Sequence, residues 1–147
     1  MTATPNLRKN DSQPILEIKN LHVEAEQSST NIPILTNISF SLQKGEILSV
    51  IGESGSGLTV LSKSIMNWLP RPLLVSEGSV LFRGQNILNL STQDLRKFRG
   101  KIFAYIGSDS STALNPTVPI GKHLVSKLRS VLPEYSDTQA QRRIIDL

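Results

Sequence analysis

The stretch that decides the fold runs from residue 47 to residue 59 and reads Ile47-Leu48-Ser49-Val50-Ile51-Gly52-Glu53-Ser54-Gly55-Ser56-Gly57-Leu58-Thr59. Its first five residues form a short apolar run, which predicts a strand buried on both faces of a mainly parallel sheet. A glycine-rich loop, residues 52–59, follows at once, and Val60–Leu69 then shows apolar residues at helical spacing. The stretch therefore predicts a strand, a loop and a helix in that order.

The loop matches the phosphate-binding pattern G-x-x-x-x-G-K-[ST] at every position except the lysine, where Leu58 stands. In such a loop the backbone N–H groups and the positive end of the helix point toward a phosphate. The candidate nucleotide-binding residues are Gly52, Glu53, Ser54, Gly55, Ser56, Gly57, Leu58 and Thr59, and Thr59 is also the candidate magnesium ligand. An isobutyl group cannot replace the lysine ammonium that contacts the β- and γ-phosphates. The competing interpretation is a plain Gly/Ser turn.

The rest of the chain predicts further short elements and a polar start. Residues 1–14 are rich in polar residues and are expected to be a disordered leader, so the folded domain is expected over residues 15–147. Ser136 and Gln139 have the spacing of a helix capping box. Strands are expected over Ile15–Val23 and Ile34–Leu42, which make a hairpin-like opening, and over Ser79–Phe82, Asn86–Leu88 and Ile102–Ile106. Helices are expected over Leu95–Arg99, Gly121–Leu132 and from Ser136 onward.

Composition excludes several classes of function. The chain has 147 residues, no cysteine, and two histidines without an acidic cluster beside them, so neither a disulfide nor a metal centre is expected. No apolar stretch is long enough for a membrane span or a secretion signal, which favours the cytoplasm. The net charge is +4, but the densest basic run, Arg96–Lys101, is interrupted by apolar residues as a solvated helix face would be, so nucleic-acid binding is not expected.

Four segments resemble the ATP-binding subunits of ATP-binding cassette (ABC) importers, most closely those of the dipeptide, oligopeptide and nickel branch. The segments are Leu16–Val23, Ile38–Glu46, the glycine loop and Thr112–Pro116, and the likeness covers nearly everything from Ile15 to Leu147. It implies an α/β fold, namely an incomplete P-loop NTPase of the ABC type. That fold has an N-terminal antiparallel β-subdomain, part of a parallel core sheet, a glutamine-loop region at residues 107–119 and the start of a helical subdomain at residues 120–147.

The resemblance also implies cofactors and partners. ATP and magnesium would bind at the phosphate loop. The partners would be the permease subunits of an importer, together with a second ABC protein in a dimer. Such a chain would be cytoplasmic, peripheral at the inner face of the membrane through the permease.

Several residues that the resemblance implies are not found. Ala25 stands where an aromatic ring stacks on adenine, and Ser108 stands where a glutamine senses magnesium and water. The Ser-Gly-Gly signature, the acidic pair that holds magnesium and the switch histidine do not occur within the 147 residues. Together with Leu58, these departures imply a truncated, degenerate ATP-binding protein that binds nucleotide weakly or not at all and does not hydrolyse it.

Two other interpretations stay open. One is a working ATPase whose second half is supplied by another chain. The other is a non-catalytic module that docks on a membrane permease through residues Ser108–Leu132, the region that makes this contact in the family the chain resembles.

Overall fold

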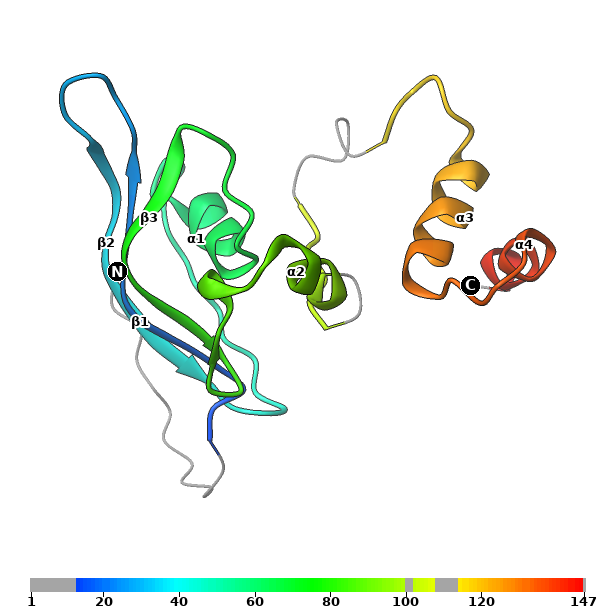
Figure 1. Cartoon of the computed structure of the whole chain (residues 1–147), viewed down its shortest axis with the longest axis horizontal. Helices are drawn as coiled ribbons and strands as arrows, with labels where there is room; N and C mark the ends of the chain where they lie inside the picture. The colour runs from blue at the N-terminus through cyan, green and yellow to red at the C-terminus, as the bar shows by residue number, and fades with distance from the viewer. Residues whose placement is uncertain (1–12, 100–101, 108–113, 147) are drawn as a thin grey trace. The chain divides into compact units, whose positions relative to one another are not determined.

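A computed structural model describes residues 13–99, 102–107 and 114–146 (Figure 1). The chain forms two compact units, Met1–Arg96 and Lys97–Leu147. Nearly all of the predicted leader, residues 1–14, lies outside the described residues. None of the helices within the described ranges has the length and apolar character needed to cross a membrane.

An antiparallel sheet of four strands dominates the first unit. Strand β1, Leu16–Ala25, and strand β2, Ile32–Leu42, form a hairpin, and this confirms the hairpin predicted from the sequence. Strand β3, Leu73–Phe82, pairs with the other side of β1 and begins six residues before the prediction. The short strand β4, Gln85–Asn86, completes the order β2-β1-β3-β4. In Figure 1 the long strands lie side by side, with β1 between β2 and β3.

Side chains of the central strand alternate between the core and solvent, as a sheet covered on one face requires. Ile18 of β1 lies opposite Phe40 of β2 and Val80 of β3, and both Ile18 and Val80 are buried. The buried apolar residues of this unit are Leu16, Ile18, Leu21, Val23, Leu35, Leu61, Val80, Phe82, Ile87 and Leu95.

Helix α1, Leu58–Ile65, follows the glycine loop and packs on the sheet through buried Leu61. It begins two residues earlier than predicted and ends four residues earlier. The early end has a local cause, since Asn67 has a φ of 46°, in the left-handed region that a right-handed helix cannot include. Pro70 therefore lies beyond the point where the helix has already ended.

The predicted strand Asn86–Leu88 is wrong beyond its first residue. A single 3-10 turn, η1, spans Ile87–Asn89. The side-chain oxygen of Asn86 accepts a hydrogen bond from the backbone N–H of Leu88 at 3.1 Å. This cap stabilises the turn in place of a strand, because asparagine satisfies backbone donors that would otherwise join a ladder.

Two predicted core strands are not formed. Residues 47–51 make no strand, and Ile47 and Ile51 are 92% and 86% exposed. Residues 102–106 form only one isolated bridge, from Phe103 to Arg99, and Ile106 is 95% exposed. A buried parallel strand needs a neighbour on each side to bond its N–H and C=O groups. The described segments supply no such neighbours, so neither run forms a strand.

Helix α2, Thr92–Phe98, starts with a cap in which Asp94 N–H donates to Ser91 Oγ at 3.2 Å. It begins three residues before the predicted Leu95. The second unit contains helix α3, Ile120–Val131, and helix α4, Asp137–Ile145. Ser136 and Gln139 form the predicted capping box at the start of α4, which confirms that prediction.

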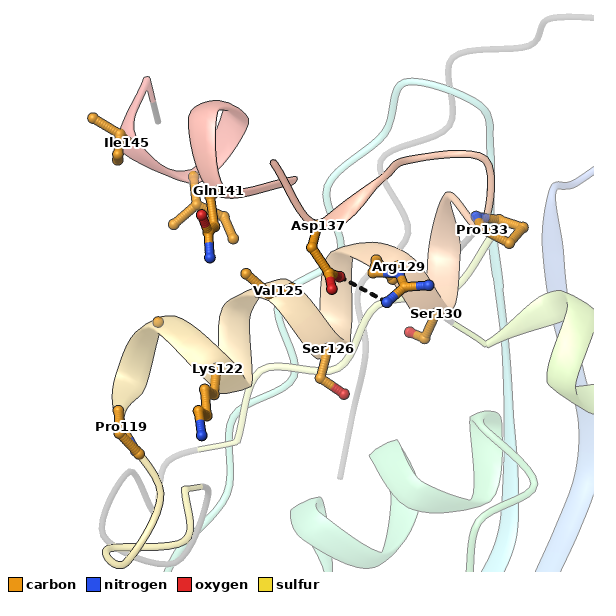
Figure 2. Close-up of a pocket in the computed structure, with 12 residues that line it drawn as sticks. Pro119, Lys122, Val125, Ser126, Arg129, Ser130, Pro133, Asp137, Gln141 and Ile145 are labelled. Atoms are coloured by element: carbon orange, nitrogen blue, oxygen red, sulfur yellow. Dashed lines mark hydrogen bonds and ion pairs between the residues drawn. The ribbon is translucent and has the colours of Figure 1, made fainter. Parts of the chain in front are cut away.

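An ion pair joins the two helices of the second unit. Arg129 of α3 contacts Asp137 of α4 at 2.7 Å, and Figure 2 shows the pair at one end of a hollow between the helices. Both side chains are half exposed, so the pair contributes about 0–1 kcal/mol.

Candidate functional site

The candidate phosphate loop, residues 52–59, lies in the first unit and leads directly into α1. Two glycines allow the backbone of the loop to take this conformation. Gly55 and Gly57 have φ values of 87° and 88°, which residues with a Cβ atom rarely adopt. The N–H of Ser56 donates to the carbonyl of Glu53 at 3.0 Å and closes a tight turn. The N–H of Leu61 donates to the carbonyl of Gly57 at 2.8 Å and begins the helix.

Gly57 fixes the loop against the sheet. A Cβ atom at this position would lie 2.7 Å from Leu35 Cδ2 and 3.5 Å from the carbonyl oxygen of Ile34, both on β2. Leu35 is a core residue with 4% exposure, so it has little room to move. The glycine is therefore required for this close approach as well as for its φ. Sequence reasoning identified Gly57 by its motif position and missed this contact, which is tertiary.

The start of α1 offers donors for an anion. The N–H groups of Leu58, Thr59 and Val60 precede the first intrahelical hydrogen bond, so the helix itself does not satisfy them. Gly57, as the N-cap, supplies no side-chain acceptor, and the first turn has no acidic residue. The hydroxyl oxygen of Ser56 is buried without a hydrogen-bond partner. These groups point to a ligand that accepts hydrogen bonds, as a phosphate does.

The residues present fit ATP and magnesium only in part. Thr59 is exposed, and its role as a magnesium ligand stays a prediction. Leu58 is half-buried as the first residue of α1, and it brings no charge to the loop. Among the described residues no three acidic or histidine side chains gather to hold a metal. The loop thus keeps its backbone donors and lacks its cation.

The position expected to stack on adenine is the end of β1. Ala25 is the last residue of that strand and pairs with Ile32 of β2 and Leu73 of β3. It carries only a methyl group. The hairpin tip that follows, residues 26–31, contains no aromatic residue either.

The glutamine-loop region is described only in part. Ser108, which stands where the resemblance implies a glutamine, lies outside the described residues, and so do Thr112 and Ala113 of the motif that ends at Pro116. Asn115 is described, and its side-chain oxygen accepts hydrogen bonds from the N–H and the hydroxyl of Thr117 at 3.0 and 2.8 Å. Its carbonyl oxygen lies 3.1 Å from His123 Nε2 on α3.

These contacts make Asn115 the residue that fixes the turn before α3. Sequence reasoning used Asn115 only as part of a family motif. The signal that was present in the sequence was the Asn-Pro-Thr order, since an asparagine side chain typically bonds the backbone two residues later in such turns.

The loop glycines allow a matched test of this geometry. Alanine at Gly57 and alanine at Gly55 both place a side chain in the left-handed region, but only the former meets a neighbour, because nothing lies within 4 Å of a Cβ at Gly55. We expect Gly57→Ala to lower the free energy of unfolding by about 1–3 kcal/mol more than Gly55→Ala. Urea unfolding followed by circular dichroism measures both. Equal losses would show that the loop does not rest on β2.

Most of the chain is similar in sequence to known proteins. The chain matches the ABC transporter family over residues 35–146. It is 36% identical over 135 residues to the dipeptide transport ATP-binding protein DppD of Lactococcus lactis, a match that covers 92% of this chain and 39% of the relative. It is 34% identical over 134 residues to the oligopeptide transport ATP-binding protein OppD of Bacillus subtilis, with 90% and 37% covered. The chain thus spans about two fifths of the length of these relatives.

Solved structures show the same fold. A dimeric ATP-binding cassette in a post-hydrolysis state, bound to ADP and phosphate, matches with a TM-score of 0.71 at 20% identity. The match covers 89% of this chain and 54% of that one. This confirms the predicted fold class, an incomplete α/β P-loop NTPase of the ABC type with an antiparallel β-subdomain, although the described residues do not form the predicted part of the parallel core sheet. The match over residues 35–146 spans far more than half of the sequence, and the chain belongs to the ABC transporter family.

Proposed function

We propose that this chain is the phosphate-loop part of an ATP-binding protein of a peptide-type ABC import system, and that it binds nucleotide weakly and does not hydrolyse it. The relatives named for dipeptide and oligopeptide transport support the assignment to this type of system. The observation that carries the second half of the proposal is Leu58, at the first position of α1 in a loop that otherwise keeps its pattern.

The magnitudes favour weak binding. Loss of a charge-assisted hydrogen bond costs about 1.5–3 kcal/mol. Loss of stacking on the base costs about 1–3 kcal/mol more, by analogy with single-stranded nucleic acids. If the two are roughly additive, affinity falls on the order of a hundred- to ten-thousandfold. A nucleotide that a complete site of this kind binds at micromolar concentration would then bind at millimolar concentration or above.

Hydrolysis is affected more strongly than binding. Phosphoryl transfer depends almost entirely on positioning and on stabilising charge that develops on the phosphate oxygens. In this chain the backbone N–H groups at the start of α1 would hold the phosphates, and Thr59 would hold the magnesium ion that neutralises part of their charge. Neither Leu58 nor any acidic cluster in the described part of the chain adds the remaining charge stabilisation or positions the attacking water.

The proposal includes partners and location. The chain would act at the inner face of the cell membrane, against permease subunits and in a dimer with a second ABC protein. A non-catalytic docking module is the second candidate function. It is favoured by the turn that Asn115 and His123 hold before α3, and by Ile120 and Leu124 of α3, which are 65% and 45% exposed.

A phosphate-release assay tests the proposal. We expect the purified chain to release no phosphate from ATP above a buffer blank, with or without magnesium, because the groups that stabilise the transferring phosphoryl are missing. The control is the Thr59→Ala variant, which removes the proposed magnesium ligand. Magnesium-dependent release that is present in the folded chain and absent in Thr59→Ala would contradict the proposal.

A further inference from the structure

The phosphate loop and the end of β1 are linked through β2. Gly57 meets β2 at Leu35, and Ala25 pairs with Ile32, three residues along the same strand. At about 3.3 Å per residue, this places the end of β1 roughly 10 Å along the strand from the loop contact. A mononucleotide whose phosphates lie at the start of α1 spans such a distance. The likeness to ABC ATP-binding subunits implies that the base lies at the end of β1, and this spacing agrees with that placement.

That neighbourhood offers no ring face to stack on a base, and its polar side chains are exposed to water. Ala25 has neither a ring face nor a hydrogen-bonding side chain. Polar residues 26–29 line an open hollow of about 640 Å³ at the tip. The two carboxylates nearby already have partners, since Glu24 accepts a hydrogen bond from Asn31 at 3.0 Å and Glu26 lies 3.9 Å from Arg71.

The candidate ligand-binding groups in the phosphate loop and at the start of α1 all suit phosphate or magnesium. They are the N–H donors of the first turn of α1, the buried and unpartnered Ser56 hydroxyl, and the exposed Thr59 hydroxyl. None of them depends on what the phosphates are attached to.

We infer that the site recognises its ligand through the polyphosphate group alone, so that it binds inorganic tripolyphosphate as tightly as ATP or GTP. The inference rests on the proposed function, because it requires the loop to act as a phosphate cradle. According to this inference, the ligands of the site are polyphosphates with or without a nucleoside, and not adenine nucleotides specifically.

The test uses Leu58→Lys, which brings binding into a measurable range without touching the end of β1. Magnesium complexes of ATP, GTP and tripolyphosphate are titrated into this variant by calorimetry, after circular dichroism has established that it is folded. The three dissociation constants are expected to agree within about threefold, since equal contacts give equal free energies. An ATP affinity tenfold or more above that of tripolyphosphate would overturn the inference and leave the proposed function standing.

A second pair of variants tests the same site by gain of selectivity. Ala25→Phe, added to Leu58→Lys, is expected to raise the affinity for ATP and GTP roughly tenfold through stacking and to leave tripolyphosphate unchanged. Ala25→Leu is the matched control, which adds apolar volume without a ring. A gain for tripolyphosphate with the phenylalanine, or an ATP affinity that does not respond to it, would contradict the placement of the base beside residue 25.

A different result is expected if the proposed function is wrong. Folded Leu58→Lys would then bind none of the three ligands, which would contradict both the phosphate-binding role of the loop and the inference that depends on it. If Leu58→Lys does not fold, the original chain is titrated at millimolar ligand and followed by the amide NMR signals of the loop glycines. The ratio of the ATP and tripolyphosphate constants then decides the inference in the same way.

Discussion

Leu58→Lys is expected to raise the affinity for a magnesium-nucleotide about ten- to hundredfold, because it returns about 1.5–3 kcal/mol of charge-assisted contact to the phosphates. The local structure at this position can accommodate a lysine side chain. Leu58 is the first residue of α1, after a glycine N-cap with a φ of 88°, and it is only half-buried. A lysine stem can occupy the same apolar surface while its ammonium extends toward the ligand.

The measurement is calorimetric titration of a magnesium-nucleotide into both proteins, with circular dichroism as the check of folding. Leu58→Met is the matched control, because it has a long flexible side chain without charge. A gain for lysine alone would assign the effect to the cation. Equal affinities for folded Leu58→Lys and the original chain would mean that the loop is not shaped as a phosphate cradle.

The variant is expected to bind nucleotide more tightly without hydrolysing it. Leu58→Lys should still release no phosphate from ATP, and neither should the double variant with Ala25→Phe. Each change adds contacts to the bound nucleotide, whereas hydrolysis also needs a positioned water and further charge stabilisation. Phosphate release by Leu58→Lys above that of the original chain would show that the lysine alone limits turnover.

The sequence predicted the local parts of the fold well. The hairpin of β1 and β2, the helix after the glycine loop, α3 and the Ser136 capping box were all predicted and are present. Each depends on residues close together in the chain, namely alternation within a strand, a cap or a glycine beside a helix. The candidate site was predicted from the pattern of contiguous residues 52–59, and the roles of these residues stay a prediction.

The core strands failed for a reason that is not local. An apolar run such as residues 47–51 indicates that its side chains favour burial. A strand also needs neighbouring strands that form hydrogen bonds with its backbone N–H and C=O groups. The described segments supply none, so the run forms no strand, and Ile47, Val50 and Ile51 are exposed. Two further features depend on contacts between distant residues and could not be read from spacing, namely the contact of Gly57 with Leu35 and the hydrogen bond between His123 and Asn115.

At Gly78 of β3 the sheet leaves almost no room for a side chain. Opposite Gly78 of β3, strand β1 bulges between Lys19 and His22, and Asn20 has a φ of 46°. Ser39 of β2 fixes the bulge from the other side, since its hydroxyl accepts the N–H of Asn20 at 2.8 Å and donates to the Asn20 side chain at 3.1 Å. The bulge therefore cannot shift easily.

Gly78→Ala is expected to cause the largest loss of stability among single alanine substitutions at the described glycines. A Cβ atom there would lie 2.6 Å from the carbonyl oxygen of Lys19 and closer still to that of Asn20, and Gly78 has a φ of 93°. Both neighbours are backbone atoms of the central strand, so relief requires the sheet itself to move. Left-handed strain of about 1–2 kcal/mol and overpacking of about 1–3 kcal/mol together predict a loss of roughly 2–5 kcal/mol.

Gly45→Ala separates the two causes of this loss. Gly45 has a similar φ of 79°, but nothing lies within 4 Å of a Cβ there, so only the strain of about 1–2 kcal/mol is expected. Urea unfolding of both variants, followed by far-ultraviolet circular dichroism, gives the difference. Because the sheet is the support on which Gly57 and the loop rest, Gly78→Ala should also abolish the nucleotide binding that Leu58→Lys restores. Equal stability of the two alanine variants would place Gly78 away from the β1 backbone and contradict the register of the sheet.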